Sequence, residues 1–336
     1  MTCKLQLRLA AVVLPIILLC AIAGCGRRMA AAAPPATIEP TPRTPDARPD
    51  IPQPPPRRRE VAILFKNAAG YTEVVAQLTK LLPVEAYRLT VVDVDAENSQ
   101  TILDSLRGKP GLLAVAISLP AARIARDQLN VPIVFAQVFN YQELLVNGKA
   151  VRGVTAMPPL DLQLQDWKRF DPKVRRLGLI VSQPHVDLIP EAERAVKTAA
   201  ISLMYEISDS DRQTLYLFKR LAPQIDGLWL VPDDRILSPT VLHEILSYAV
   251  SHGVRVCVFS DALLQWGALM SASPTPDDIA RTVRRVLDDM ISDRTNALPP
   301  LTSLSEVVVR INGQVAGRLG VSFPPNGSWV VRGQRR

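Results

Sequence analysis

The sequence predicts an α/β protein made of two Rossmann-like lobes, each a parallel sheet covered by helices, joined by a hinge. Short, continuous apolar runs alternate with amphipathic stretches from residue 60 onward. Such runs are typical of strands buried on both faces of a parallel sheet. The alternation pauses near residue 151 and restarts at residue 160, and about 275 residues suffice for two domains.

The first lobe is predicted from residues 61–138. In the segment Tyr71–Leu82, the apolar residues Val74, Val75 and Leu78 recur at helical spacing and mark one buried face. A second helix is predicted to follow Pro120, because proline suits the first turn of a helix. Strands are predicted over Val61–Phe65, Leu89–Val94, Leu112–Ile117 and Ile133–Val138, with helices over Tyr71–Leu82, Gln100–Leu106 and Ala121–Leu129.

The second lobe repeats this alternation after a connecting stretch, Val151–Met157, which we interpret as a crossover between lobes. Apolar runs of strand length again alternate with amphipathic helical stretches. Strands are predicted over Arg176–Val181, Ser202–Ile207, Gly227–Val231 and Val254–Phe259, with helices over Leu160–Phe170, Ile189–Ala200, Asp211–Leu221 and Pro239–Ser251.

The N-terminal segment is predicted to be a targeting signal. Lys4 and Arg8 precede the apolar run Leu9–Ala23, which at about 15 residues is shorter than the roughly 20 that span a membrane. The run ends in Ile-Ala-Gly-Cys, typical of a bacterial lipoprotein cleavage box in which Cys25 takes the lipid. An ordinary secretory signal and an uncleaved anchor are the alternatives. After processing, only Cys257 remains as a free thiol, so the mature chain has no internal disulfide.

Residues 27–59 are predicted to be an extended tether. The segment is rich in proline and arginine and has few apolar side chains other than alanine, so it cannot bury a core. A proline-rich docking motif is the alternative. The leader and this tether carry most of the net charge of +7, and the body from Glu60 onward is nearly neutral. The basic tether suits lipid head groups, and the nearly neutral body excludes a nucleic-acid partner.

Candidate site residues follow directly from the strand order. Ligands of open parallel sheets bind beyond the carboxyl ends of the strands, and two facing sheets place two such edges around one cleft. Serine, asparagine and aspartate residues at such positions also commonly cap helices, which is the alternative role for the candidates. The predicted ligand-binding residues are Asn67, Ser118, Asn140, Ser182, Asp233 and Ser260.

Several segments, in order, resemble the substrate-binding proteins of ABC transporters related to tryptophan- and tyrosine-binding lipoproteins. The segments are Pro132–Val138, Val151–Thr155, Pro172–Leu179, Asp226–Asp233, Gly267–Leu269 and Ile311–Gly320. The resemblance covers nearly all of residues 60–325. It implies a type I periplasmic-binding fold. With the signal peptide and tether, the predicted domains are a signal peptide (1–24), a tether (25–59), a first lobe (60–155 and 265–325), a second lobe (156–264) and a C-terminal tail (326–336). Within the first lobe, Gly267–Ala272 would return the chain, followed by a helix over Asp277–Met290.

The resemblance implies lobe closure on an amino acid or similar small molecule, delivered to an ABC permease. This chain departs from the family pattern at two positions. It has Asn140 where the family usually has an acidic residue, and Leu119 where the family often has a threonine. Asp233 remains the candidate partner for a ligand ammonium group. We therefore carry over no specificity for aromatic amino acids.

Two other functions stay open on the sequence alone. The lost polar positions and the long tether would suit a binding-protein-like envelope lipoprotein with a sensory or protein-interaction role. Gly26 favours the outer membrane for such a protein, although the choice of membrane stays open. An enzyme is disfavoured because the sequence has no G-x-S-x-G elbow and no phosphate-binding loop. No cofactor and no metal site are expected, since His185, His243 and His252 are scattered.

Overall fold

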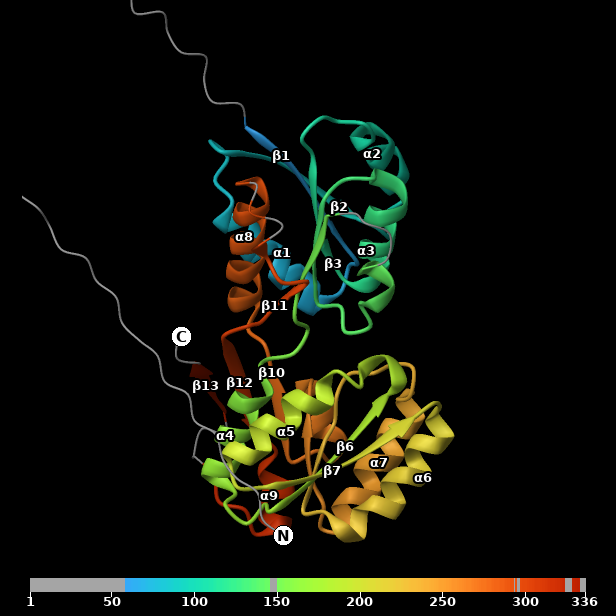
Figure 1. Cartoon of the computed structure of the whole chain (residues 1–336), viewed down its shortest axis with the longest axis vertical. Coiled ribbons are helices and arrows are strands. Elements are labelled where there is room, and N and C mark those ends of the chain that lie inside the picture. The colour runs from blue at the N-terminus through green and yellow to red at the C-terminus, as the bar shows by residue number, and fades with distance from the viewer. Residues whose placement is uncertain (1–57, 146–149, 293, 295–296, 324–327, 333–336) are drawn as a thin grey trace, which may run out of the picture. The chain divides into compact units, whose positions relative to one another are not determined.

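The computed structural model describes residues 58–145, 150–292, 294 and 297–323, and the backbone of 328–332 (Figure 1). The described residues from 58 onward belong to one compact unit. The predicted lipidation site Cys25 and nearly all of the predicted tether lie outside the described residues.

The first lobe is a parallel sheet buried on both faces. Within the described residues it has six strands in the order β11-β5-β4-β3-β1-β2. In β1 (Arg59–Phe65), Val61 and Ile63 pack into one core and Ala62 and Leu64 into the opposite one. The other strands are β2 (Tyr87–Asp93), β3 (Leu113–Ile117), β4 (Ile133–Ala136), β5 (Val151–Val154) and β11 (Leu301–Thr302).

Helices cover the two faces of this sheet (Figure 1). Helices α1 (Ala69–Leu81) and α8 (Pro276–Ile291) cover one face, and α2 (Ser99–Leu106) and α3 (Leu119–Ile124) the other. Because α8 buries apolar side chains at steps of three and four residues, it packs along α1 although some 200 residues separate them.

The second lobe contains a mixed sheet in the order β13-β12-β10-β9-β8-β6-β7. The strands are β6 (Arg176–Ser182), β7 (Ser202–Ser208), β8 (Gly227–Trp229), β9 (Arg255–Val258), β10 (Met270–Ser273), β12 (Glu306–Ile311) and β13 (Ser328–Arg332). Strand β12 runs antiparallel to both of its neighbours, and the other pairs are parallel.

Helices also cover both faces of this second sheet. Leu177 and Leu179 of β6 pack into a core with α4 (Leu160–Phe170), α5 (Leu188–Thr198) and α9 (Gly313–Leu319). Ile180, from the opposite face of the strand, packs into a core with α6 (Asp211–Leu221) and α7 (Pro239–Ser251). Ser210 and Ser238 start α6 and α7 by accepting a backbone N–H with their hydroxyl groups.

The chain crosses between the lobes three times, over 155–159, 274–275 and 303–305. We expected 265–325 to return to the first lobe, and the strand pairing corrects this. Met270–Ser273 pairs with Cys257–Val258 and with β12 in the second sheet, and only α8 and β11 join the first. The expected crossover 151–157 is also shorter, because Val151–Val154 is a strand of the first sheet. Apolar runs indicate where strands lie along the chain, but they do not indicate which sheet each strand joins.

Among the described residues, no helix is long and apolar enough to cross a membrane. Cys257 is a buried free thiol, and burial raises its pKa above the ordinary value.

Gly153 provides a test of core packing in the first sheet. A Cβ atom added there would lie 2.2 Å from Cζ of Phe135 and 2.6 Å from Cδ2 of Leu301. We expect Gly153→Ala to destabilise the protein by about 1–3 kcal/mol, because the added methyl group overpacks the core. Urea unfolding followed by circular dichroism measures the change.

The matched control is Gly317→Ala in α9, where a Cβ would meet no atom within 4 Å. Alanine there should leave stability unchanged or raise it by up to about 1 kcal/mol. Equal unfolding midpoints for the two variants would contradict the packing around β5.

Candidate functional site: the cleft between the lobes

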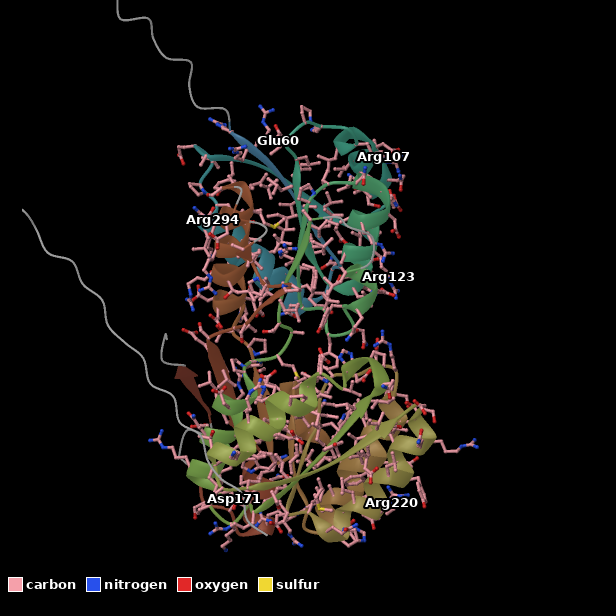
Figure 2. The ribbon with its side chains drawn as sticks, viewed as in Figure 1. Glu60, Arg107, Arg123, Asp171, Arg220 and Arg294 are labelled. Atoms are coloured by element: carbon pink, nitrogen blue, oxygen red, sulfur yellow. The ribbon has the colours of Figure 1, made fainter. Side chains whose placement is uncertain are left out.

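A cavity of about 790 Å³ lies between the carboxyl ends of the strands of the two sheets. The first lobe contributes the start of α1, the start of α3 and the loop after β4. The second lobe contributes the loops after β8 and β9 and part of β12. The lining residues used below are Tyr71, Leu119, Arg123, Phe139, Asn140, Asp234, Phe259, Ser260, Asp261 and Arg310. In Figure 2, Arg123 lies at the end of the first lobe that faces the second, and Glu60 at the opposite end.

Two of the six predicted site residues line this cavity, namely Asn140 and Ser260. Asn67 follows β1 as predicted, but its side chain is exposed and does not line the cavity. Ser118, Ser182 and Asp233 follow their strands as predicted and are buried beneath the cavity wall. The strand ends therefore meet at one edge, while individual side chains turn either into the cleft or into the lobe.

Ser118 and Asp233 both serve the backbone of their own lobes. The Ser118 hydroxyl accepts the N–H of Ala121 at the start of α3, and its backbone has a left-handed φ of 105°. The fully buried Asp233 carboxylate accepts the N–H of Ser182 at 3.1 Å and of Arg235 at 3.3 Å. Asp233 thus ties the loop after β8 to the end of β6. The Ser182 hydroxyl is buried with no hydrogen-bond partner among the described residues.

Asn140 is the centre of a polar network between the lobes. Its Nδ2 donates to the Asp234 carboxylate. Its Oδ1 accepts from Arg235 at 2.8 Å and lies 2.7 Å from Nε2 of His185. Asn140 belongs to the first lobe and its three partners to the second. We name these four residues the cross-lobe network.

The cross-lobe network separates the cleft from a second cavity of about 1160 Å³ beside α4 and α5. His185 lines the second cavity, whereas Asn140 and Asp234 line the first. The His185 ring also packs on Phe139, with centroids 4.1 Å apart, and Phe139 lines both cavities. His185 and Arg235 also follow strand ends, but they were not among the predicted site residues because their contacts depend on the opposite lobe.

Both arginines that line the cleft form ion pairs with carboxylates. Arg123 makes two hydrogen bonds to the Glu143 carboxylate, at 2.5 and 3.1 Å, and Arg310 pairs with Asp261. The Arg123 hydrogen bonds lower the pKa of Glu143. Because Arg123 is half exposed, this pair adds little to stability.

Aromatic and aliphatic side chains alternate with polar groups along the remaining walls of the cleft. Tyr71, Phe139, Phe259 and Leu119 are partly buried side chains that line it. Partial burial raises the pKa of Tyr71, so its phenol stays neutral. Apolar walls with a few polar groups are typical of small-molecule sites. Among the described residues, no group of three or more His, Cys, Asp or Glu side chains is arranged to hold a metal ion.

Comparison with solved structures places this fold in a known class. No protein-family model and no curated protein matches the chain. A domain from Streptococcus pneumoniae in complex with L-Trp superposes with a TM-score of 0.53 and 17% identity, covering 80% of this chain and 97% of that one. The ligand-free, open structure of a substrate-binding protein with adhesive properties from Clostridium difficile gives 0.58 and 15%, with the same coverage.

A conserved domain protein from Vibrio cholerae gives a TM-score of 0.53 and 15% identity, again covering 80% of this chain and 97% of that one. At these identities the comparisons show the fold. The chain has the type I periplasmic-binding fold of ABC-type substrate-binding proteins, as the resemblance of its sequence segments implied.

A substitution at Asp233 tests whether this residue stabilises the second lobe or binds a ligand in the cleft. Asp233→Ala leaves two backbone N–H groups without their acceptor, so we expect a loss of about 1–3 kcal/mol in the free energy of unfolding. Chemical unfolding measures this loss. The matched control, Asp209→Ala at an exposed position of the same lobe, should change stability by less than about 0.5 kcal/mol. An Asp233→Ala variant as stable as the control would refute the supporting role.

Proposed function

We propose that this protein is an extracytoplasmic solute-binding protein that closes its two lobes on a small molecule. The observation that carries the proposal is the cavity of about 790 Å³ bounded by the carboxyl edges of both sheets. Its volume lies in the range of small-molecule sites. The L-Trp complex of the Streptococcus pneumoniae domain supports a small organic solute as ligand.

The three crossovers support closure by a hinge. Thr155 of the first crossover accepts the N–H of Leu304 in the third with its hydroxyl oxygen. The buried Asp278 carboxylate, at the start of α8, accepts the N–H groups of Ser305 and Glu306. Because these bonds connect the crossover region along one side of the cleft, rotation about it opens or narrows the cavity. Binding and closure need no covalent step, so we propose no catalytic activity.

We further propose that the protein is held to a membrane by lipid on Cys25 and delivers its solute to an ABC permease. The support is the cleavage box, the Pro- and Arg-rich segment and the fold. In the folded body, β1 begins at the end of its sheet opposite the cleft (Figure 1).

One observation favours the second candidate, a sensory or protein-interaction lipoprotein. The Asn140 side chain, a predicted ligand group, is fully engaged by the second lobe, with its amide bonded to Asp234, Arg235 and His185. A ligand must therefore bind beside this network or displace it. A protein that responds to lobe position without importing a solute would have the same geometry.

Solute binding can be tested by calorimetry with a library of amino acids, polyols and small amines. We expect at least one solute to bind, and Tyr71→Ala to weaken its binding about tenfold or more, because the change removes an aromatic wall of the cleft. The matched control is Tyr216→Ala, at an exposed tyrosine on α6 that does not line the cleft.

A solute that binds both tyrosine variants with equal affinity would place the site elsewhere. Absence of binding by every solute in the library would favour the sensory or interaction role instead.

The anchor is tested separately by metabolic labelling with an alkyne-bearing palmitate. We expect Cys25→Ser to abolish labelling and release the protein from the membrane fraction, because the residue loses the thiol that takes the lipid. Cys20→Ser should label normally, since the bulky Leu19 precedes that cysteine. Label retained in the Cys25→Ser variant would exclude this residue as the lipidation site.

A further inference from the structure

The hydrogen bonds of His185 fix which of its nitrogens carries the proton. Nε2 of His185 lies 2.7 Å from Oδ1 of Asn140, an oxygen that can only accept. Nδ1 lies 3.0 Å from Nε2 of Gln142, which also donates to the carbonyl oxygen of Pro184 at 2.9 Å. The ring is therefore neutral, with a proton on Nε2 and an acceptor at Nδ1.

Both partners of the ring belong to the opposite lobe. Asn140 and Gln142 lie in the loop after β4 of the first lobe, whereas His185 follows β6 of the second. The hydrogen bond from Gln142 to Nδ1 thus needs the neutral ring, whereas Nε2 donates to Asn140 in either state. The Arg235 guanidinium, 2.8 Å from the Asn140 oxygen, lies 3.5 Å from Nε2 of His185.

A proton added to Nδ1 would face the amide nitrogen of Gln142, and two donors cannot bond to each other. Rotating the Gln142 amide would present its oxygen to His185, but the same oxygen would then face the carbonyl oxygen of Pro184, and two acceptors cannot bond to each other. A positive ring would also face the Arg235 guanidinium. The cross-lobe contact therefore weakens when the ring becomes charged.

We propose that the contact of His185 with Asn140 and Gln142 is a proton-sensitive latch. It holds the two lobes together while the ring is neutral, and it loosens when the ring takes up a proton. This inference deepens the proposed function, because the latch would set how readily the cleft admits a solute.

Charged and titratable groups surround the ring on every side. Asp187 lies on its own loop, and the loop after β8 contributes Asp233, Asp234 and Arg235. The first lobe contributes Tyr141, whose hydroxyl donates to Asp187 at 3.0 Å. Glu191 on α5 lines the cavity of about 1160 Å³, as His185 does. The three aspartates favour the charged ring, whereas burial and Arg235 disfavour it.

Burial is the largest of these effects and lowers the pKa of His185 below its ordinary value. When the lobes separate, water reaches the ring again and the pKa of His185 returns to its ordinary value of about 6.5. The latched state then binds fewer protons than the open state. The latch is at full strength above about pH 6.5 and weakens as the pH falls towards the lowered pKa.

The test measures lobe separation without any solute. Spin labels are attached to p-azidophenylalanine at Glu97 and Arg212, exposed positions on the first and second lobes, which avoids the native cysteines. Electron double resonance on the full chain in detergent gives the distance distribution between the labels. Between pH 7.5 and pH 5.0 we expect the short-distance population to fall several-fold.

Histidine variants identify the group responsible. His185→Gln should remove the pH response, whereas His252→Gln, at an exposed histidine at the end of α7, should keep it. Arg235→Gln removes one bond between the lobes but leaves the ring, so it should lower the short-distance population at both pH values and retain the response. Circular dichroism checks that each variant is folded.

Two results would overturn the latch. One is a wild-type distance distribution that does not change with pH, and the other is a pH response that persists in a folded His185→Gln variant. Both are independent of solute binding. A protein that binds no solute can still possess the latch, and a solute-binding protein can lack it.

Discussion

Burial of both faces of each sheet is the constraint on which the rest of the structure depends. Successive residues of β1 pack into opposite cores, and so do those of β6. With both faces covered by helices, only the edges at which strands end are left for polar side chains. The loops after β4, β8 and β9 reach the cleft for this reason, and no special loop sequence is needed to bring them together.

The same edges explain why most polar groups near the cleft are engaged by the protein itself. Arg123 and Arg310 are paired with carboxylates, Asp233 holds two backbone N–H groups, and Asn140 bonds to the opposite lobe. Asp233 and Asn140 are buried, and a buried polar group is costly unless it is hydrogen-bonded, so both have partners within the fold. The cavity of about 790 Å³ is therefore lined by apolar side chains together with polar groups that the protein itself already holds in position.

The sequence predicted the structure best where the spacing of apolar residues determines whether a segment forms a strand or a helix. The strands and helices of residues 61–138 and 160–259 followed from apolar runs, and the two-lobe architecture followed from their repetition, as the structure confirms; the strands β5 and β10 to β13 were not predicted. Lobe membership at the C-terminal end did not follow, because Met270–Ser273 and Glu306–Ile311 have the composition of strands in either sheet. Of the six candidate residues, Asn140 and Ser260 line the cleft, and the strand ends gave their place along the chain but not the direction of each side chain.

The amino-acid sequence by itself determined the class of fold and the order of the elements over residues 61–138 and 160–259, because hydrophobic spacing is a local property of the chain. The tertiary structure alone decided that the chain crosses between lobes three times, that Asp233 turns inward and that His185 meets Asn140. These features depend on contacts between residues about 45 or more positions apart. Such contacts exist only once the two lobes have folded and face each other.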